Sequence, residues 1–220
     1  MNQTADAIIV GAGIIGSAIS FELAKKGYQV INLDKLPDAG YGSTSNSCAI
    51  VRFHYSTRDG IIMAHEGYFY WKNWGDYLEA PDERGHARFR EVGMLMLKTT
   101  LDDYLAIESY FEEVGVPFER WDNAMIQARL PLNTGLYGPP KLPSDESFWT
   151  EAHGTLAGAT FTPQGGYVTD PQLATHNLMR AAEAKGSQFI YNAEVSEVRQ
   201  VGGRVSGVTL KDGTRLDAPI

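Results

Sequence analysis

Short apolar runs and a helical pattern of apolar positions alternate over the first 35 residues. The run Ala7–Val10 predicts a buried strand, and the apolar positions that follow it, up to Gly27, recur with the period of a helix. A second apolar run, residues 28–33, predicts another strand and ends at the acidic Asp34. The order strand, helix, strand predicts a parallel βαβ unit and therefore an α/β fold.

The middle of the chain carries an apolar stripe that predicts a helix over residues 61–78 with one buried face. Such a stripe is typical of core packing, and a surface that stacks on a cofactor is the alternative. Its members recur at intervals of three and four residues: Tyr68, Trp71, Trp74 and Leu78. Further elements are predicted: a strand over 89–98, a helix over 102–114, an irregular connector over 131–166, a helix from Pro171 to Gly186 with Asp170 as its N-cap, and a strand over 188–191.

Three strand-like runs end the chain, at residues 194–201, 204–210 and 214–220. The pairs Gly202-Gly203 and Asp212-Gly213 separate them, and both pairs are typical of tight hairpin turns. This part of the chain therefore predicts a three-stranded antiparallel meander.

Three glycines between the first strand and the first helix have the spacing G-x-G-x-x-G. Gly11 allows a sharp turn, Gly13 lets a pyrophosphate approach the backbone, and Gly16 lets the helix pack closely on the strand. The helix would then offer its N–H groups and positive dipole end to the phosphates. The carboxylate of Asp34 can accept both hydroxyls of an adenosine ribose but would repel a 2′-phosphate, so FAD or NAD is favoured over NADP. A glycine-rich turn without a ligand is the alternative.

Composition limits the partners and the compartment. The chain has 220 residues, 43% of them hydrophobic, which is enough for one large domain or two small ones. A net charge of −8 predicts no binding of nucleic acid or of an anionic membrane, and no segment reaches the roughly 18 apolar residues of a membrane span. The single cysteine, Cys48, cannot form an internal disulfide and fits a reducing compartment, so we expect a cytoplasmic protein. The histidines show no metal-ligand spacing, and no metal site is expected.

The segment after Asp34 is rich in Gly, Ser and Thr, which predicts a loop at the end of a parallel strand, where such sheets bind ligands. Three segments together resemble the D-amino-acid-oxidase-like superfamily of FAD-dependent oxidoreductases, most closely its sarcosine oxidase and dimethylglycine dehydrogenase branch. They are VGAGIIGSAISFELAKKGYQVINLDK, GYGSTSNSCAIVRFHY, and GGYVTDPQLATHNLMRAAEAKG followed by the meander. The resemblance implies a Rossmann-like FAD-binding domain with an interleaved, incomplete α+β substrate domain.

The resemblance also implies an enzyme that oxidises the C–N bond of a secondary or tertiary amino acid by hydride transfer to FAD. The family's substrate-binding arginine falls on Arg52, whose planar guanidinium suits a carboxylate, and a tyrosine of the same site falls on Tyr55. An intramolecular or surface ion pair is the alternative role for Arg52. His54 is a candidate base or covalent flavin anchor and is left unassigned, so no side chain is named as catalytic. The implied cofactor contacts are Gly11, Gly13, Ile14, Ile15, Gly16, Asp34, Lys35, Ser43, Thr44, Ser45, Cys48, Ala49, Ile50, Val51 and, through its backbone, Val195.

The sequence departs from the family pattern at three positions. Ser45 and Ala49 stand where the monomeric sarcosine oxidases carry basic residues beside the flavin, which disfavours sarcosine itself as the substrate. Asp34 replaces the commoner glutamate, which keeps the ribose contact with a shorter reach.

The implied boundaries are residues 1–80 for the first part of the FAD-binding domain, 81–165 for the substrate-domain insertion and 166–220 for the continuation of the FAD-binding domain. Because relatives are longer and residues 214–220 predict a strand with nothing after it, we expect a fragment, a truncated chain or one part of a split enzyme. A C-terminal partner chain would then complete the site. The alternative functions are an NAD-dependent dehydrogenase and a non-catalytic nucleotide-binding piece of a split or multisubunit enzyme.

Overall fold

The computed structural model describes residues 3–138 and 141–220, and these form two compact units. Unit 1 contains the described residues up to Ile50, together with Tyr70–Arg90 and Tyr167–Ile220. Unit 2 contains Val51–Phe69 and Glu91–Gly166. The assignment of cofactor and substrate roles to the residue ranges 1–80, 81–165 and 166–220 stays a prediction.

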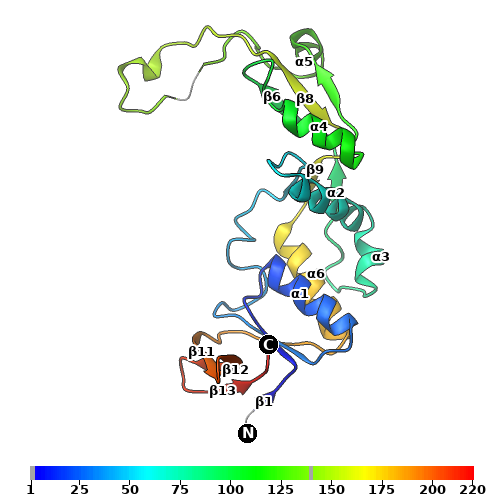
Figure 1. Cartoon of the computed structure of the whole chain (residues 1–220), viewed down its shortest axis with the longest axis vertical. Helices are drawn as coiled ribbons and strands as arrows, with labels where there is room; N and C mark the ends of the chain where they lie inside the picture. Colours follow the sequence, from blue (N-terminus) through cyan, green and yellow to red (C-terminus); the bar gives the residue numbers. More distant parts are fainter. Residues whose placement is uncertain (1–2, 139–140) are drawn as a thin grey trace. The chain divides into compact units, whose positions relative to one another are not determined.

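Unit 1 is built on a parallel sheet with the strand order β10-β3-β2. Its strands are β2 (Ala7–Val10), β3 (Val30–Leu33) and β10 (Gln188–Ile190), and Ile31 of β3 lies opposite both Ile8 and Gln188. Helix α1 (Ile14–Lys25) connects β2 to β3, and it packs against α6 (Pro171–Ala184), as Figure 1 shows. The predicted βαβ unit is therefore confirmed.

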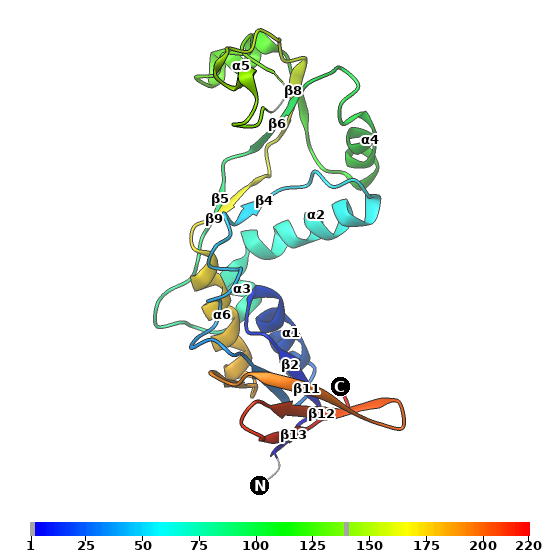
Figure 2. The same ribbon diagram turned by 90° about the vertical axis from the view of Figure 1, so that its left-hand side faces the viewer.

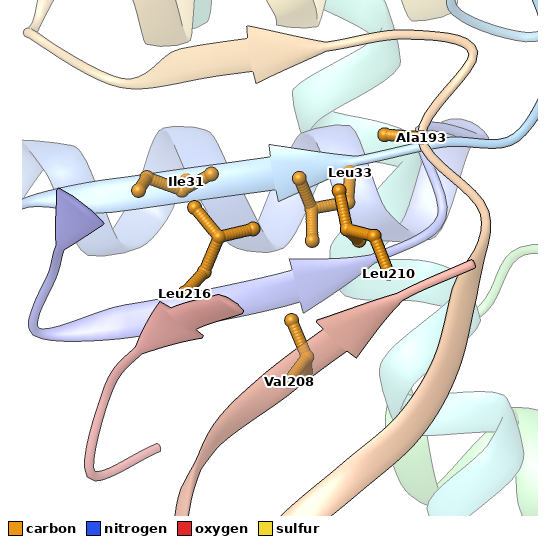
Figure 3. Close-up of a cluster of buried hydrophobic side chains, with 6 residues drawn as sticks. All are labelled: Ile31, Leu33, Ala193, Val208, Leu210 and Leu216. Carbon is orange, nitrogen blue, oxygen red and sulfur yellow. The ribbon is translucent and has the colours of Figure 1, made fainter. Parts of the chain in front are cut away.

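A second sheet of unit 1 has the order β1-β13-β12-β11. Strands β11 (Val195–Val201), β12 (Arg204–Leu210) and β13 (Arg215–Asp217) form the predicted antiparallel meander, and β1 (Gln3–Thr4) joins β13 in parallel (Figure 2). A buried apolar cluster joins this sheet to the parallel one. Figure 3 shows its side chains, Ile31, Leu33, Ala193, Val208, Leu210 and Leu216.

Helix α6 is held in unit 1 by its cap and by a buried amide. The Asp170 side chain accepts a hydrogen bond from the Leu173 N–H, and Pro171 occupies the first turn, as predicted. Asn177, which is 1% exposed, accepts hydrogen bonds from Trp74 Nε1 and Ala87 N. Its amide nitrogen donates to Asp82 and to the Gly85 carbonyl, and the short helix α3 (Trp74–Leu78) is thereby tied to α6.

Unit 2 contains an antiparallel sheet with the order β6-β8-β7, made of β6 (Met94–Lys98), β8 (Gly158–Thr162) and β7 (Glu119–Trp121). The helices α4 (Leu105–Val114) and α5 (Asn123–Arg129) and the 3-10 helix η1 (Glu146–Trp149) belong to the same unit. Glu108 of α4 is fully buried and accepts hydrogen bonds from Lys98, Arg120 and Thr160. Burial alone would raise the pKa of Glu108, but these donors outweigh it and hold that pKa below its ordinary value.

The chain passes between the two units within four elements: β4 (Ile50–Val51), α2 (Arg58–Lys72), β5 (Phe89–Glu91) and β9 (Gly166–Val168). Among the described residues, no helix combines the length and the apolar composition that a bilayer crossing requires.

Four predicted elements need correction. The helix over 61–78 is two helices, because Asn73 leaves the helical conformation between α2 and α3. The strand over 89–98 is divided into β5 and β6 at Gly93, which has a φ of +79°. The helix expected from residue 102 begins at Leu105, because the Asp103 carboxylate binds Thr99 and Thr100 in a preceding turn.

The fourth correction concerns residues 131–166, which were expected to be an irregular connector. They contain η1 and β8, the central strand of the sheet in unit 2. Residues 139–140 of this connector lie outside the described residues. The strand β7 and the helix α5 were not predicted. The apolar stripe is confirmed as core at three positions, because Tyr68, Trp74 and Leu78 are at most 7% exposed.

Candidate functional site

The glycine-rich turn between β2 and α1 has the geometry that its sequence predicts at two of the three glycines. Gly11 has a φ of +107°, which residues with a side chain rarely adopt. A Cβ on Gly16 would lie 1.9 Å from the Gly11 carbonyl oxygen, so only glycine lets the helix start this close to the turn. A Cβ on Gly13 would meet the Thr44 hydroxyl at 3.2 Å. The backbone at Gly13 therefore faces the loop that follows β3.

Asp34 connects the end of β3 to the glycine turn. One carboxylate oxygen accepts the Ala12 N–H at 2.7 Å, and the other accepts the Leu36 N–H at 2.9 Å. Each oxygen of a carboxylate has a second lone-pair direction, so both can still accept a hydroxyl. Asp34 thus fixes the turn and remains able to bind a ribose.

The loop after β3 is attached to the start of α1. The Thr44 hydroxyl accepts a hydrogen bond from the Ile14 N–H at 3.2 Å, and the Gly40 N–H donates to the Ala12 carbonyl at 2.9 Å. Gly13, the N-cap residue, has no side chain to bind the first turn of α1. The Thr44 hydroxyl supplies the capping oxygen instead. Other anionic or hydroxyl oxygens would also be favoured beside the free N–H groups at this end of α1.

A pocket of about 460 Å³ in unit 1 is lined by the glycine turn, the end of β3, the following loop and the start of the meander. Seven predicted residues meet there: Gly11, Gly13, Asp34, Lys35, Ser43, Thr44 and Val195. Further lining residues were not predicted from the sequence, namely Val10, Leu33, Leu36, Gly42, Ala193 and Glu194. Their positions within two residues of predicted ones were the only sequence signal for them.

The other predicted cofactor residues do not line this pocket. Ile14, Ile15 and Gly16 lie in the first turn of α1, where Ile15 is 74% exposed. Ser45 and Cys48 are exposed, and Ala49 has a φ of +50°. Ile50 ends unit 1 and Val51 begins unit 2, so contacts of these two residues with a cofactor stay predictions.

The two predicted substrate residues meet each other in unit 2. The Arg52 guanidinium carbon lies 5.2 Å from the centre of the Tyr55 ring, a cation–π contact. No carboxylate among residues 3–138 and 141–220 pairs with Arg52. Burial, followed by the nearby Arg52 charge, lowers the pKa of His54 to about 4, so its ring is neutral at pH 7.

One cluster in unit 1 has the composition of a metal site. One ligand atom each from Asp82, Glu83 and His176 lies within 4.8 Å of the others. His176 Nδ1 already bonds Asp82 at 2.8 Å, and the same carboxylate oxygen accepts a hydrogen bond from Asn177. Because His176 and Asn177 both belong to α6, these hydrogen bonds attach α6 to the segment around Asp82. We therefore interpret the cluster as structural.

The family model for FAD-dependent oxidoreductases matches residues 6–220 of the chain. A D-amino acid dehydrogenase of Paramagnetospirillum magneticum is 24% identical over 247 aligned residues, which cover 94% of this chain and 57% of the relative. An N-methyl-L-tryptophan oxidase of Yersinia pestis is 24% identical over 212 residues, which cover 95% of this chain and 50% of the relative. The chain therefore spans about half the length of the curated relatives it matches.

Solved structures share the fold. The L-proline dehydrogenase of P. horikoshii superposes with a TM-score of 0.77 at 21% identity, covering all of this chain and 52% of that protein. The glycine oxidase of Geobacillus kaustophilus gives a TM-score of 0.73 at 22% identity, covering 99% of this chain and 54% of that protein. These matches confirm the predicted Rossmann-like α/β fold.

Proposed function

The chain belongs to the family of FAD-dependent oxidoreductases, and from this premise we propose that its pocket in unit 1 holds the adenosine and diphosphate part of FAD. The observation that carries the proposal is the meeting of the glycine turn, Asp34, the loop at Ser43 and Thr44, and Val195 around one cavity. A pocket of about 460 Å³ is within the usual range for small-molecule sites. The NAD-dependent alternative is set aside, because the matched family uses FAD.

The residues that line the pocket fit such a ligand. The Asp34 carboxylate would accept the ribose hydroxyls, and the backbone of Val195 would contact the adenine. The start of α1 and the Thr44 hydroxyl would bind the diphosphate, because helix N-termini favour anions. A Cβ added at Gly13 would lie nearest to that same hydroxyl. The diphosphate would therefore bind beside Thr44, next to the backbone of Gly13.

We propose further that the whole protein oxidises the C–N bond of a secondary or tertiary amino acid. FAD, when bound, supplies the acceptor for the two electrons. In this chain Arg52 would bind the substrate carboxylate through two parallel hydrogen bonds, and Tyr55 would hold the guanidinium in place. Orientation of the reacting C–H bond is then the contribution of these residues. The name of one relative, an N-methyl-L-tryptophan oxidase, supports a secondary amino acid as the substrate. The name of another, a D-amino acid dehydrogenase, supports only the broader class of amino acids.

Two finer points belong to the same proposal. The single cysteine supports a cytoplasmic location. Because the relatives are about twice as long, residues from elsewhere in the protein or from a partner chain would complete the flavin and substrate pockets.

The test is the absorption spectrum of the purified flavoprotein before and after anaerobic addition of N-methylated amino acids. The proposal predicts bleaching of the flavin bands. The variant Arg52→Lys is expected to need at least tenfold more substrate for half-maximal bleaching, whereas Arg58→Lys, a matched change at an exposed arginine paired with Glu113, is not. Flavin bands that no amino acid bleaches would contradict the substrate class and favour a non-catalytic nucleotide-binding piece.

A further inference from the structure

Four consecutive residues of unit 2 differ sharply in exposure. Arg52 and Tyr55 are exposed, whereas Phe53 is 0% and His54 is 5% exposed. The Tyr55 N–H donates to the Phe53 carbonyl at 2.9 Å, which closes a three-residue turn centred on His54. The chain therefore bends at a buried histidine.

This turn is what brings Arg52 and Tyr55 together. In an extended strand, side chains three residues apart point to opposite faces, and about 10 Å of backbone separates them. Here the Arg52 guanidinium lies over the Tyr55 ring at 5.2 Å. The stacking of these two side chains thus depends on the conformation at His54.

Aromatic rings hold the His54 side chain. The ring of Phe111, in α4, meets it edge-on at 5.0 Å and 86°, and the ring of Tyr104 meets it at 6.1 Å and 84°. Neither ring nitrogen of His54 has a hydrogen-bond partner among the described residues. Since no polar contact fixes the ring, its position is set by packing alone.

The other side of the turn is fixed by Phe53 and by a glycine. Phe53 packs edge-on against Tyr68 and His65 of α2. A Cβ on Gly60, also in α2, would lie 3.2 Å from the Tyr55 Cβ, so this glycine leaves just enough room for the Tyr55 side chain. Tyr55 is thereby backed by the helix while its ring stays in reach of Arg52.

We propose that His54 is a positioning residue whose buried ring anchors the turn that holds Arg52 over Tyr55, and that it thereby sets the geometry of the carboxylate site. The carboxylate part of this inference rests on the proposed function of Arg52. The structural part does not, because it concerns only the contact between Arg52 and Tyr55.

The test is nuclear magnetic resonance of the isotope-labelled protein, in which the Tyr55 ring shifts the side-chain signals of Arg52. Arg52→Lys identifies those signals and Tyr55→Leu removes the ring shift. The variant His54→Ala is expected to lose the ring shift and to raise the Kd for N-methylalanine, measured by isothermal titration calorimetry, about tenfold or more. The variant His54→Phe, which keeps an aromatic ring between Tyr104 and Phe111, is expected to restore both values.

A matched control separates positioning from general stability. Phe118→Ala removes another ring that packs on Phe111, at 5.7 Å, and is expected to leave the Arg52 signals unchanged. If His54→Ala lowers the thermal midpoint but leaves the ring shift and the Kd unchanged, the proposal is wrong. A folded His54→Phe protein without the ring shift would also overturn the proposal. If His54→Ala does not fold, the comparison of His54→Phe with the parent protein is the deciding test. If Arg52→Lys binds N-methylalanine as tightly as the parent in the same calorimetric titration, the carboxylate role fails, while the ring-shift comparison still tests the anchor.

Discussion

Two glycine-to-alanine substitutions, each within a helix, are expected to change stability in opposite directions. Alanine is favoured over glycine inside a helix by about 0.5–1 kcal/mol, since glycine has more conformational freedom to lose. Gly67 of α2 has no heavy atom within 4 Å of the position of a Cβ, so Gly67→Ala should gain this stabilisation in full.

At Gly16 a steric clash opposes the same gain. The added Cβ would lie 1.9 Å from the Gly11 carbonyl oxygen, and real contacts of this kind essentially never fall below 3.0 Å. The Gly11 backbone cannot easily yield, because its φ is +107° and its N–H donates to Leu33 at 2.7 Å. Helix α1 must therefore move away from β2. Overpacking costs roughly 1–3 kcal/mol or more, and a contact of 1.9 Å, far below the 3.0 Å limit, lies at the upper end of that range. Subtracting the helix preference of about 0.5–1 kcal/mol leaves a net loss of about 2 kcal/mol or more.

Urea unfolding followed by circular dichroism measures both effects against the parent protein. The midpoint for Gly67→Ala should rise and the midpoint for Gly16→Ala should fall. A Gly16→Ala protein as stable as the parent would refute the reasoning about close packing at the turn. A Gly67→Ala protein less stable than the parent would show that open space around the position was inferred wrongly.

Three further predictions concern buried polar groups. Asn177→Leu should lower the free energy of unfolding by about 3–5 kcal/mol, because the Trp74 indole N–H and other groups of unit 1 lose their buried partner; a loss below about 1 kcal/mol in urea unfolding would contradict this. Glu108→Leu should lower the free energy of unfolding by about 3–5 kcal/mol, since it leaves the Lys98 ammonium buried without a counter-charge. Adding Lys98→Met to the same protein should recover most of this free energy. No recovery would argue against the ion pair as the cause. Because the pKa of His54 is lowered to about 4 in the folded protein, the unfolded chain binds this proton more readily, so stability falls as the pH drops from about 6.5 toward 4, by at most about 1.4 kcal/mol per pH unit. Urea midpoints at pH 7 and pH 5 should therefore differ less in His54→Leu than in the parent, and an equal difference would contradict the assignment.

Features encoded by neighbouring residues were predictable from the sequence. The G-x-G-x-x-G turn is largely local, because Gly11 and Gly16 answer demands of the backbone within six residues of each other. The same holds for α6, where Asp170 caps the helix and Pro171 starts it, and for the turn at Gly202-Gly203, where both residues have a positive φ.

Elements that depend on distant partners were not predictable. Strand β8 lies in a stretch rich in proline and glycine, and its strand structure comes from pairing with β6 and β7, which are distant in the sequence. At its start, Gly158 has a φ of +132°, and a Cβ there would lie 2.7 Å from the Trp121 carbonyl oxygen. The sequence around Gly158 carries no sign of this contact, which exists only in the folded unit.

The candidate site also combines features encoded by neighbouring residues with features that depend on distant partners. The pocket residues at the glycine turn and at Asp34 follow from a motif, whereas Ala193 and Glu194 enter the pocket because of where the meander begins. The pairing of Arg52 with Tyr55 requires the turn at His54, which the residue types alone do not predict.

The measurement that tests the central claim most directly is a titration of the cofactor-free protein with FAD, followed by flavin fluorescence, in the presence and absence of ADP. If the pocket at Asp34 and Val195 holds the adenosine and diphosphate part of FAD, ADP must compete with FAD. Asp34→Asn should then weaken FAD binding about tenfold or more, as expected for hydrogen bonds to a charged group. Asp38→Asn, which removes the same charge in the same loop outside the pocket, should leave the affinity unchanged. FAD binding that ADP does not affect, or that the two variants weaken equally, would contradict the account.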